Sequence, residues 1–313
     1  MNTMRVLESG LHTTVQDLGR EGYGPMGVSP SGAADAVALR LGNRLVGNPE
    51  GAAALEMTLV GGGFVFVDDA VVALTGSDFG ATLDGAGVAP WSSVVARAGA
   101  TLRLGPTRTG ARAYLCVHGG LVVKPFLGSA STHTMTGLGG LEGRALRKGD
   151  ELRVGPATES FRKRAVVRKA LERLVPRKIL RVTAGEQFEW YSESSRRVLF
   201  DGVYRVLEQS NRMGIRLDGP PVAGQRGGEM ITEGVSLGAI QVPSDGLPIV
   251  LFVDQQTTGG YPKLANVVSA DLASLGQLRP RDEVRFELVD FEKARSLWIE
   301  QERLVASQEV IAE

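Results

Sequence analysis

The sequence has few of the residues that build disulfides, metal centres or reactive thiol sites. Its 313 residues include one cysteine and three histidines. A single thiol excludes an internal disulfide and a cysteine-rich metal site. Cys116 stands within the apolar run at residues 113–117, so we interpret it as a small core residue. The histidines are scattered and no HExxH motif is present, so we expect no bound metal.

Net charge and long apolar runs are missing as well. The 35 lysines and arginines balance the 35 aspartates and glutamates, so no overall field attracts nucleic acid or an acidic membrane surface. No segment approaches about 18 consecutive apolar residues. Residues 1–10 lack the charged start and apolar block of a secretion signal. We therefore expect a cytoplasmic protein that binds neither nucleic acid nor membrane.

Several well-known catalytic motifs are absent. The sequence has no GxxxxGK[ST] phosphate-binding loop and no GxGxxG that opens a helix after a strand. It also lacks the GxSxG turn of serine hydrolases. What remains is a supply of carboxylates, amides, hydroxyls and amines. These groups suit recognition of a polar small-molecule substrate and stabilisation of developing charge.

Glycine, in contrast, is abundant. The 41 glycines are scattered between short apolar runs, which is typical of short strands joined by tight turns. From residue 54 to residue 154 such strands alternate with turns, as in an antiparallel barrel or sandwich. We expect helices at residues 34–45, 161–175, 194–200 and 265–275, and from residue 291 onward.

The helix at residues 34–45 has more than one candidate for its N-terminal cap. Ser29 and Ser31 precede it and can accept a backbone N–H. Asp35 falls in its first turn, where a carboxylate also stabilises the helix dipole. Capping therefore explains Asp35 about as well as a functional role does.

The two halves of the chain share an ordered pattern, which indicates two related domains. In the first half an apolar strand leads to His118 and paired glycines, and Asp150 opens a later strand. In the second half an apolar strand leads to Asp254 and paired glycines, and Asp282 opens a later strand. We therefore predict a mainly β protein with a few helices, built from two tandem related β-barrel domains.

The predicted boundaries follow from this pattern. An N-terminal β-barrel domain spans residues 1–158, a basic helical linker 159–177, a C-terminal β-barrel domain 178–290 and a C-terminal helix 291–313. The linker sequence FRKRAVVRKALERLV has apolar residues at helical spacing and a basic exposed face. Because the whole chain has balanced charge, we interpret it as a solvated connector.

The densest group of reactive side chains follows a predicted buried strand near residue 250. Residues 253–263 (VDQQTTGGYPK) contain a carboxylate, amides, hydroxyls, a phenol and an amine. Gly259 and Gly260 can adopt backbone angles closed to other residues and allow a ligand to approach the main chain. A tight hairpin with a solvated tip also explains the segment. The repeat favours a functional loop, because it gives the segment a counterpart after His118.

Candidate site residues come from this loop and from other polar strand ends. The catalytic candidates are Asp254, Lys263, His118 and Glu233. A lone histidine at a strand end is more often structural, so both interpretations of His118 stay open. The substrate-binding candidates are Arg20, Asp78, Gln241, Gln255, Gln256, Thr257, Thr258, Gly259, Gly260 and Tyr261.

Six segments, in chain order, resemble one known family. They are residues 14–23 (TVQDLGREGY), 27–35 (GVSPSGAAD), 74–81 (LTGSDFGA), 117–120 (VHGG), 212–219 (RMGIRLDG) and 255–263 (QQTTGGYPK). The pattern is similar to allophanate hydrolase subunit 2. This family is also known as the C subunit of 5-oxoprolinase, as the antagonist of a sporulation-kinase inhibitor, and as a biotin-dependent carboxyltransferase domain.

The resemblance implies a fold of tandem cyclophilin-like β-barrels, which agrees with the repeat. It also implies a partner, a homologue of allophanate hydrolase subunit 1, which is the B subunit of 5-oxoprolinase. In the 5-oxoprolinase system the two act with a third subunit and open the lactam of 5-oxoproline to glutamate with ATP. We therefore expect an ATP-dependent hydrolase subunit. ATP would bind to this chain, to the partner, or across their interface.

Two alternatives stay open. Within urea carboxylase, the same pair of domains implies transfer of a carboxyl group from biotin to urea. This chain has no Met-Lys-Met biotin-carrier motif and is too short to include a biotin carboxylase, so a stand-alone hydrolase subunit fits better. The second alternative is a regulatory protein that binds a kinase inhibitor. The substrate, the catalytic base and the stoichiometry of the complex are left open by the sequence.

Overall fold

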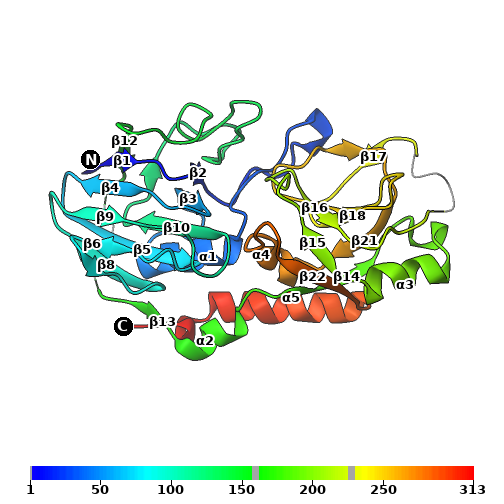
Figure 1. Cartoon of the computed structure of the whole chain (residues 1–313). Helices are drawn as coiled ribbons and strands as arrows, with labels where there is room; N and C mark the ends of the chain where they lie inside the picture. Colours follow the sequence, from blue (N-terminus) through cyan, green and yellow to red (C-terminus); the bar gives the residue numbers. More distant parts are fainter. Residues whose placement is uncertain (1, 157–161, 225–229) are drawn as a thin grey trace. The chain divides into compact units, whose positions relative to one another are not determined.

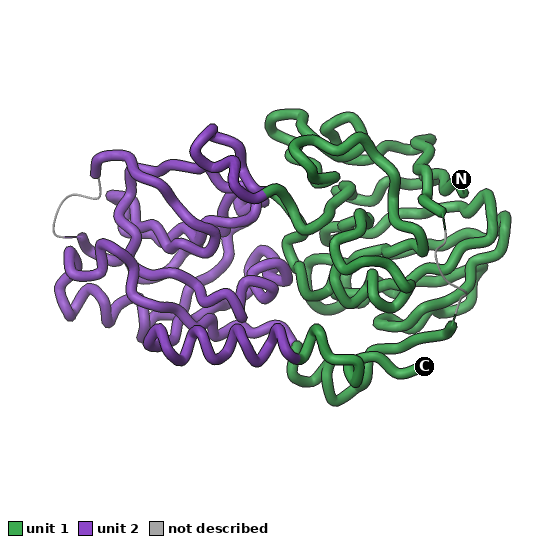
Figure 2. The backbone as a smooth tube through the Cα atoms, turned by 180° about the vertical axis from the view of Figure 1, so that it is seen from behind, with its two compact units in different colours: residues 1–20, 31–174, 304–313 green, residues 21–30, 175–303 purple. Residues whose placement is uncertain are grey.

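Short strands dominate the structure, as the scattered glycines and apolar runs predict. A computed structural model describes residues 2–156, 162–224 and 230–313 (Figure 1). The backbone divides into two units, which have separate colours in Figure 2. Unit 1 comprises Met1–Arg20, Ser31–Leu174 and Leu304–Glu313, and unit 2 comprises Glu21–Pro30 and Val175–Arg303. The predicted boundary between residues 158 and 159 lies outside the described residues.

Unit 1 contains two antiparallel sheets of seven strands each. The first sheet has the order β11 (Leu121–Val122), β12 (Glu151–Val154), β1 (Asn2–Glu8), β4 (Gly63–Phe66), β9 (Thr101–Arg103), β6 (Thr82–Leu83) and β7 (Ala86–Gly87). The second sheet has the order β2 (His12–Gln16), β3 (Ala54–Thr58), β10 (Arg112–Val117), β5 (Ala70–Gly76), β8 (Ser92–Ala96), β13 (Ala165–Val166) and β23 (Ile311–Ala312).

Both sheets of unit 1 contribute to one hydrophobic core. In β1 the buried residues alternate, with Met4 and Val6 at 0% and 1% exposure. Leu55 of β3 and Leu115 of β10 belong to the same core cluster. Because side chains of a strand point alternately to its two faces, each sheet places one face inside. Burial of one such side chain stabilises the fold by about 1.5–3 kcal/mol.

Helix α1 (Ala36–Leu45) packs on β5 and β10 of the second sheet. Asp35 is its cap, because Oδ1 of this residue accepts an N–H of the first turn at 2.9 Å. The predicted serine caps are therefore wrong. Gly42 allows close approach to the sheet, since a Cβ there would lie 2.7 Å from Thr75 Oγ1 and from Cys116 Sγ. Cys116 is fully buried, as predicted, and burial raises the pKa of its thiol.

Unit 2 contains a closed barrel of seven strands. Their order is β14 (Ile179–Ala184), β21 (Lys263–Val267), β18 (Ala239–Gln241), β19 (Ile249–Leu251), β16 (Gly214–Asp218), β15 (Tyr204–Val206) and β22 (Glu283–Leu288). The closing pair, β14 with β22, is parallel and the other pairs are antiparallel. A separate two-stranded sheet joins β17 (Glu233–Gly234) to β20 (Thr258–Gly259). Of the two predicted barrels, the one in unit 2 is a closed barrel. The strands of unit 1 form two sheets, so the prediction of a second closed barrel is not confirmed.

The remaining helices are α2 (Arg168–Arg173), α3 (Glu193–Asp201), α4 (Leu272–Leu275) and α5 (Phe291–Ala306), with 3-10 turns η1 (Gly24–Met26), η2 (Phe188–Trp190), η3 (Ser269–Asp271) and η4 (Gln308–Val310). The predicted helix at residues 194–200 is confirmed. The predicted C-terminal helix at 291–313 is confirmed as far as Ala306 and is wrong beyond it, because η4 and β23 follow. The predicted helix at 161–175 starts outside the described residues, and its described part is β13 followed by α2. Among the described residues, no helix combines the length and the apolar composition that a membrane span requires.

The predicted helix at residues 265–275 is wrong over its first half. Residues 263–267 form β21, which pairs with β14 and with β18. A short apolar run does not distinguish a buried strand from a buried helix by its periodicity alone. Two neighbouring strands satisfy the backbone of β21 on both sides, and the helix begins only at Leu272.

The pattern shared by the two halves folds into the same turn in both units. In unit 1 the Asp150 carboxylate accepts the N–H of Arg147 at 2.7 Å, and the Asp150 N–H donates to the Arg147 carbonyl at 3.1 Å. In unit 2 Asp282 makes the same two bonds with Arg279, at 2.9 and 3.1 Å. The predicted repeat is therefore present in the backbone geometry of this turn.

Both turns continue identically into the sheet. The residue before each aspartate has a positive φ, 92° at Gly149 and 73° at Arg281. Gly149 donates its N–H to the Val6 carbonyl at 2.8 Å, and Arg281 donates to the Val206 carbonyl at 2.8 Å. The two valines return their N–H groups to the aspartate carbonyls, at 2.9 Å in each unit.

Candidate functional site

Strand pairing in unit 2 gathers several of the predicted site residues. On the small sheet, Glu233 of β17 is the register partner of Gly259 of β20. A short way further along the chain, β21 begins at Lys263, whose register partner on β18 is Gln241. An irregularity in β18 precedes this pair, and such bulges re-aim the side chains next to them. Glu233, Gln241 and Lys263 therefore lie in one part of the unit.

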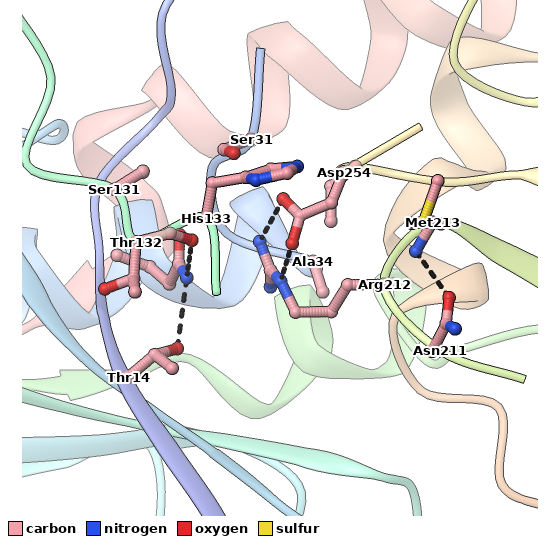
Figure 3. Close-up of polar contacts among 12 residues, drawn as sticks. Thr14, Ser31, Ala34, Ser131, Thr132, His133, Asn211, Arg212, Met213 and Asp254 are labelled. Atoms are coloured by element: carbon pink, nitrogen blue, oxygen red, sulfur yellow. Dashed lines mark hydrogen bonds and ion pairs between the residues drawn. The ribbon is translucent and has the colours of Figure 1, made fainter. Parts of the chain in front are cut away.

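Asp254, which follows β19, forms a buried ion pair with Arg212 (Figure 3). Nε and Nη2 of Arg212 donate to the two carboxylate oxygens at 2.8 and 3.1 Å. The Asp254 and Arg212 side chains are 5% and 8% exposed. The Asp254 N–H also donates to the Arg212 carbonyl at 2.8 Å. Two parallel bonds fix the plane of the carboxylate, so this pair is suited to holding the strand end in position.

Lys263 is the centre of a second charged cluster. Its Nζ lies 2.7 Å from a Glu186 oxygen, 2.6 Å from Glu233 Oε1 and 3.2 Å from the Gly234 carbonyl. These acceptors match the three N–H groups of an ammonium. The cluster therefore contains two carboxylates and one ammonium.

Burial and charge act in opposite directions on the lysine. Burial, the larger single influence, disfavours the charged amine, but the two carboxylates together outweigh it and raise the pKa of Lys263. The hydrogen bond from Lys263 lowers the pKa of Glu233, with a smaller contribution from Gln187. Both residues are therefore charged at neutral pH.

Gln187 ties the backbone of this cluster to one of its carboxylates. Its Oε1 accepts the Lys263 N–H at 3.0 Å, and its Nε2 donates to Glu233 Oε1 at 2.8 Å. The residue is only 6% exposed and stands in the turn after β14. The side-chain amide thus keeps Glu233 beside the ammonium.

The predicted loop residues after Asp254 differ in burial. Gln255 is buried, and its Oε1 has no hydrogen-bond partner within the part of the chain that the structure describes. Gln256, Thr258 and Tyr261 are exposed, and Thr257 is half-buried. The exposed side chains can meet a ligand or another protein, whereas the Gln255 oxygen is an unsatisfied acceptor.

Close packing explains at least one of the two glycines in the loop. A Cβ at Gly259 would lie 2.5 Å from the Nε2 atom of Gln241, which is 1% exposed. The same Nε2 atom donates to the Tyr261 carbonyl at 3.4 Å. Neither Gly259 nor Gly260 has a positive φ in the described structure, so the predicted need for special backbone angles is wrong.

His118 lies in unit 1, at the end of β10, and is held by the backbone. Its N–H donates to the Val71 carbonyl at 2.8 Å. Its Nδ1 is hydrogen-bonded to the Val46 carbonyl, and because a carbonyl only accepts, Nδ1 carries the proton. The N–H of the next residue, Gly119, donates to Asn48 Oδ1 at 2.8 Å. These bonds are those of an ordered turn.

Arg20, also in unit 1, is 3% exposed. Its guanidinium donates to the Ser131 carbonyl and to Ser31 Oγ, and it lies 5.5 Å from the centre of the Phe126 ring. The guanidinium therefore ties residues 31 and 131 to the segment that follows β2.

Asp78 occupies a turn of unit 1 and is partly exposed. Its Oδ1 accepts the Gly80 N–H at 2.7 Å, and its Oδ2 lies 3.2 Å from Arg108 Nη1. The structure thus places His118, Arg20 and Asp78 in unit 1 and the other candidates in unit 2.

Comparison with known proteins identifies the family. A family model described as carboxyltransferase domain, subdomain A and B, matches residues 26–288. The chain belongs to this carboxyltransferase family. It is 36% identical to the 5-oxoprolinase C subunit of Escherichia coli K12 over 300 residues, which are 96% of each chain. The corresponding protein of Haemophilus influenzae is 35% identical over 93% of each chain.

Larger members of the carboxyltransferase family contain the same domain. Urea amidolyase of Saccharomyces cerevisiae is 36% identical over 92% of this chain, but the match covers 17% of that protein. The crystal structure of Kluyveromyces lactis urea carboxylase superposes with a TM-score of 0.91 at 33% identity. That match covers 99% of this chain and 30% of the other. The chain thus spans nearly the whole bacterial subunits and a minor part of the fungal enzymes.

Sequence reasoning missed three residues of the site in this family member. Arg212 stands in one of the six segments that resemble the family, but its pairing with Asp254 has no signal in the chain. Glu186 and Gln187 contact Lys263 from 77 and 76 residues away. The one local signal is that this pair of polar residues lies in a glycine-containing turn shortly after an apolar run, which is β14 in the structure. The described residues include no group of three or more histidines, cysteines or carboxylates that could hold a metal.

Proposed function

We propose that the chain is one subunit of a heteromeric, ATP-dependent lactam hydrolase of the 5-oxoprolinase type. The observation that carries this proposal is the reciprocal match to the 5-oxoprolinase C subunit of Escherichia coli, which covers 96% of both chains. The name of that relative implies that it works with other subunits. We infer a partner homologous to the B subunit of 5-oxoprolinase, also called allophanate hydrolase subunit 1, and an active site shared with it.

In this proposal Lys263 supplies a fixed positive charge. Hydrolysis of a lactam C–N bond places negative charge on the former carbonyl oxygen, and an ammonium next to that oxygen stabilises it. The raised pKa of Lys263, which its two carboxylate partners cause against the effect of burial, keeps the amine protonated. A protonated amine is neither a nucleophile nor a base, so Lys263 acts through its positive charge, since its three N–H groups already have acceptors.

We assign proton transfer to Glu233 in preference to Asp254. Both carboxylate oxygens of Asp254 are held by Arg212, whereas the bonds that Glu233 accepts from Lys263 and Gln187 both end on Oε1. Oε2 of Glu233 can therefore accept a proton from an attacking water. The lowered pKa of Glu233 keeps it ionised and also makes it a weaker base than an ordinary glutamate. Asp254 then positions the loop that follows it.

The loop supplies the groups that bind the substrate. Gln255 Oε1 is a buried acceptor without a partner among the described residues, which suits the N–H of a lactam. The other proposed contacts are Gln241, Gln256, Thr257, Thr258 and Tyr261. In this scheme Gly259 serves by leaving room for the Gln241 amide.

The described residues of this cluster do not fit the triphosphate of ATP. Polyphosphates require cationic or N–H donors that are open to the ligand. Lys263 is engaged by two carboxylates and Arg212 by Asp254, so the cluster has an excess of negative charge. We therefore assign no step at this cluster to ATP and propose that the partner subunits bind it.

The finer architecture is also part of the proposal. We propose that the two units are related modules of the cyclophilin-like barrel type. The identical turns at Asp150 and Asp282 support a common origin, because the same hydrogen bonds recur with the same register to the neighbouring strand.

Reconstitution tests the function directly. The chain, the homologue of the B subunit and the third subunit are co-purified, and ATP hydrolysis is measured with and without 5-oxoproline. We expect turnover that depends on the substrate and on this chain. Lys263→Met should abolish it, whereas Lys293→Met, which changes an exposed lysine on α5, should not. ATP turnover that does not respond to 5-oxoproline would sink the proposal.

A carboxyltransferase reaction is the second candidate. The family model and the superposition on urea carboxylase over 99% of this chain favour it. Here the same polar groups would hold the ureido carbonyl of carboxybiotin and a urea-like acceptor, and biotin would be the cofactor. Carboxybiotin is mixed with the chain and its subunit 1 partner, and decarboxylation is followed. No decarboxylation above background would exclude this candidate.

A further inference from the structure

The three acceptors around the Lys263 ammonium differ in their exposure to solvent and in the number of other bonds that hold them in place. The Gly234 carbonyl belongs to the backbone of β17. The Glu233 side chain is 35% exposed and has a second bond, from Gln187. The Glu186 side chain is 69% exposed and lies in the turn after β14, and Lys263 itself is only 6% exposed. The buried ammonium of Lys263 is thus paired with one well-exposed carboxylate, that of Glu186.

We propose that Glu186 is a placeholder that the carboxylate of the substrate displaces from Lys263. This inference rests on the proposed function and names the ligand class of that site, a lactam that carries a carboxylate. The incoming carboxylate takes the position of the Glu186 oxygen, 2.7 Å from Nζ. No covalent bond changes in this exchange.

The energetics favour an exchange at this position. When Glu186 moves away, the Lys263 ammonium still has the Glu233 carboxylate and the Gly234 carbonyl as acceptors, so its charge stays paired during the exchange. A pair whose carboxylate is 69% exposed is weak, because water screens it. A ligand carboxylate restores the same charge and the same hydrogen bond. The exchange therefore has little cost beyond that of binding the ligand.

Glu233 is not an equivalent candidate for displacement. Moving it would break its bond from Gln187 as well as its bond from Lys263, at 2.8 and 2.6 Å. It also belongs to β17, which is paired with β20. The ligand therefore replaces the exposed carboxylate and keeps the anchored one.

A matched pair of variants tests the placeholder. Glu186→Gln keeps the shape but removes the competing charge. Glu189→Gln removes a carboxylate of similar exposure, 79%, that pairs with Arg196 and not with Lys263. Binding of 5-oxoproline and of 2-pyrrolidinone, which lacks the carboxylate, is measured by calorimetry on the full chain. Glu186→Ala is a second variant, in case the glutamine alters the fold.

We expect Glu186→Gln to tighten 5-oxoproline binding roughly fivefold, which corresponds to about 1 kcal/mol. Glu189→Gln should leave the dissociation constant unchanged, and neither variant should change that of 2-pyrrolidinone. Affinity for 5-oxoproline that stays within about twofold of wild type in both Glu186 variants would overturn the inference. Equal tightening by Glu189→Gln would do the same.

Acetate separates failure of this inference from failure of the proposed function. Acetate is titrated into the wild-type chain and into Glu186→Gln, and the backbone amides of Gln187 and Lys263 are followed by NMR. Stronger acetate binding by the variant supports the placeholder even if the assembled enzyme does not act on 5-oxoproline. If the assembled enzyme does act on 5-oxoproline but acetate binding and KM are the same in both proteins, the placeholder is wrong and the function stands.

Discussion

Two strand ends that the repeat makes equivalent are held by different chemistry. After β10 in unit 1, His118 and its neighbour are fixed by neutral hydrogen bonds to backbone carbonyls and to Asn48. After β19 in unit 2, Asp254 is fixed by a buried guanidinium. The two strand ends therefore share a place in the repeat, but the buried ion pair is present at the strand end of unit 2 and not at that of unit 1.

The turns that precede β12 and β22 show the opposite behaviour. Asp150 and Asp282 make the same bonds to the residue three positions earlier. One carboxylate oxygen closes the turn, and the other accepts a hydrogen bond from Arg144 in unit 1 and from Lys178 in unit 2. Equivalent positions thus stay alike where they build the fold and differ where a site is proposed.

Arg212→Ala gives the largest expected difference between the two strand ends. It leaves Asp254 buried and unpaired, so we expect a loss of about 3–5 kcal/mol in the free energy of unfolding. The measurement is urea unfolding at neutral pH. The double variant Arg212→Met with Asp254→Leu should recover most of the loss, because it removes both charges. A loss below about 1 kcal/mol for Arg212→Ala would contradict the buried pair.

Asn48→Ala tests the neutral strand end of unit 1. Asn48 Oδ1 accepts the Gly119 N–H, and Nδ2 donates to the Val117 carbonyl, both at 2.8 Å. Leaving these backbone groups unpaired should cost about 1–3 kcal/mol. Asn48→Asp keeps the acceptor for the Gly119 N–H. The midpoint of its thermal unfolding should therefore lie between those of the wild-type protein and Asn48→Ala. If Arg212→Ala lost less free energy of unfolding than Asn48→Ala, the neutral strand end of unit 1 would contribute more to stability than the charged strand end of unit 2, contrary to our expectation.

Gly149→Ala and Arg281→Gly test whether the two turns are interchangeable. A Cβ at Gly149 meets nothing within 4 Å, so the expected loss of about 1–2 kcal/mol comes from the positive φ alone. Arg281→Gly relieves that strain in unit 2. The glycine also increases the conformational entropy of the unfolded chain, and the variant loses the exposed ion pair of Arg281 with Glu208. The net change in the free energy of unfolding should therefore be near zero. The free energy of unfolding of both variants is measured with a chemical denaturant. If Arg281→Gly lost as much stability as Gly149→Ala, glycine would suit one turn and not the other, and the two turns would not be interchangeable.

The smallest expected effect concerns pH. The pKa of Glu233 is lowered in the folded chain, mainly by Lys263, from an ordinary value of 4.5. Its contribution to stability is therefore present above that value and is lost as pH falls through the lowered pKa. Because the side chain is 35% exposed, Glu233→Gln should cost about 1 kcal/mol or less at about pH 7 and still less at about pH 3.

Asp150→Asn is the counterpart of this variant in unit 1. Arg144 is the largest influence that lowers the pKa of Asp150, so the same sign and the same acid window apply. Unfolding free energies of both variants are compared with wild type at neutral pH and at about pH 3. A gap between either variant and wild type that widens at low pH would contradict the direction of the shift.

The parts of the fold that the sequence predicts correctly are those that depend on contacts between residues close together in the chain. The turns at Asp150 and Asp282 depend on contacts three residues apart, so their pattern is visible in the chain. The strand at residues 263–267 depends on pairing with β14 and β18, which are distant in sequence. Its apolar run, taken without those partners, fits a helix equally well.

The same distinction applies to the candidate site. Lys263, Glu233 and Gln241 can be proposed together because they are polar residues at or beside strand ends. The partner of Asp254 is 42 residues away, and Glu186 is 77 residues from Lys263. A single sequence carries no local signal for such pairs, because only the pairing of β14 with β21 and of β16 with β19 brings them together.

The discontinuous composition of unit 1 sets an order of events during synthesis. Residues 304–313 complete this unit, since β23 pairs with β13 and Arg44 of α1 donates to the Val305 and Ser307 carbonyls. The ribosome delivers all of unit 2 before these residues emerge. The nascent chain therefore holds a complete unit 2 while the edge of the second sheet at β13 still lacks β23.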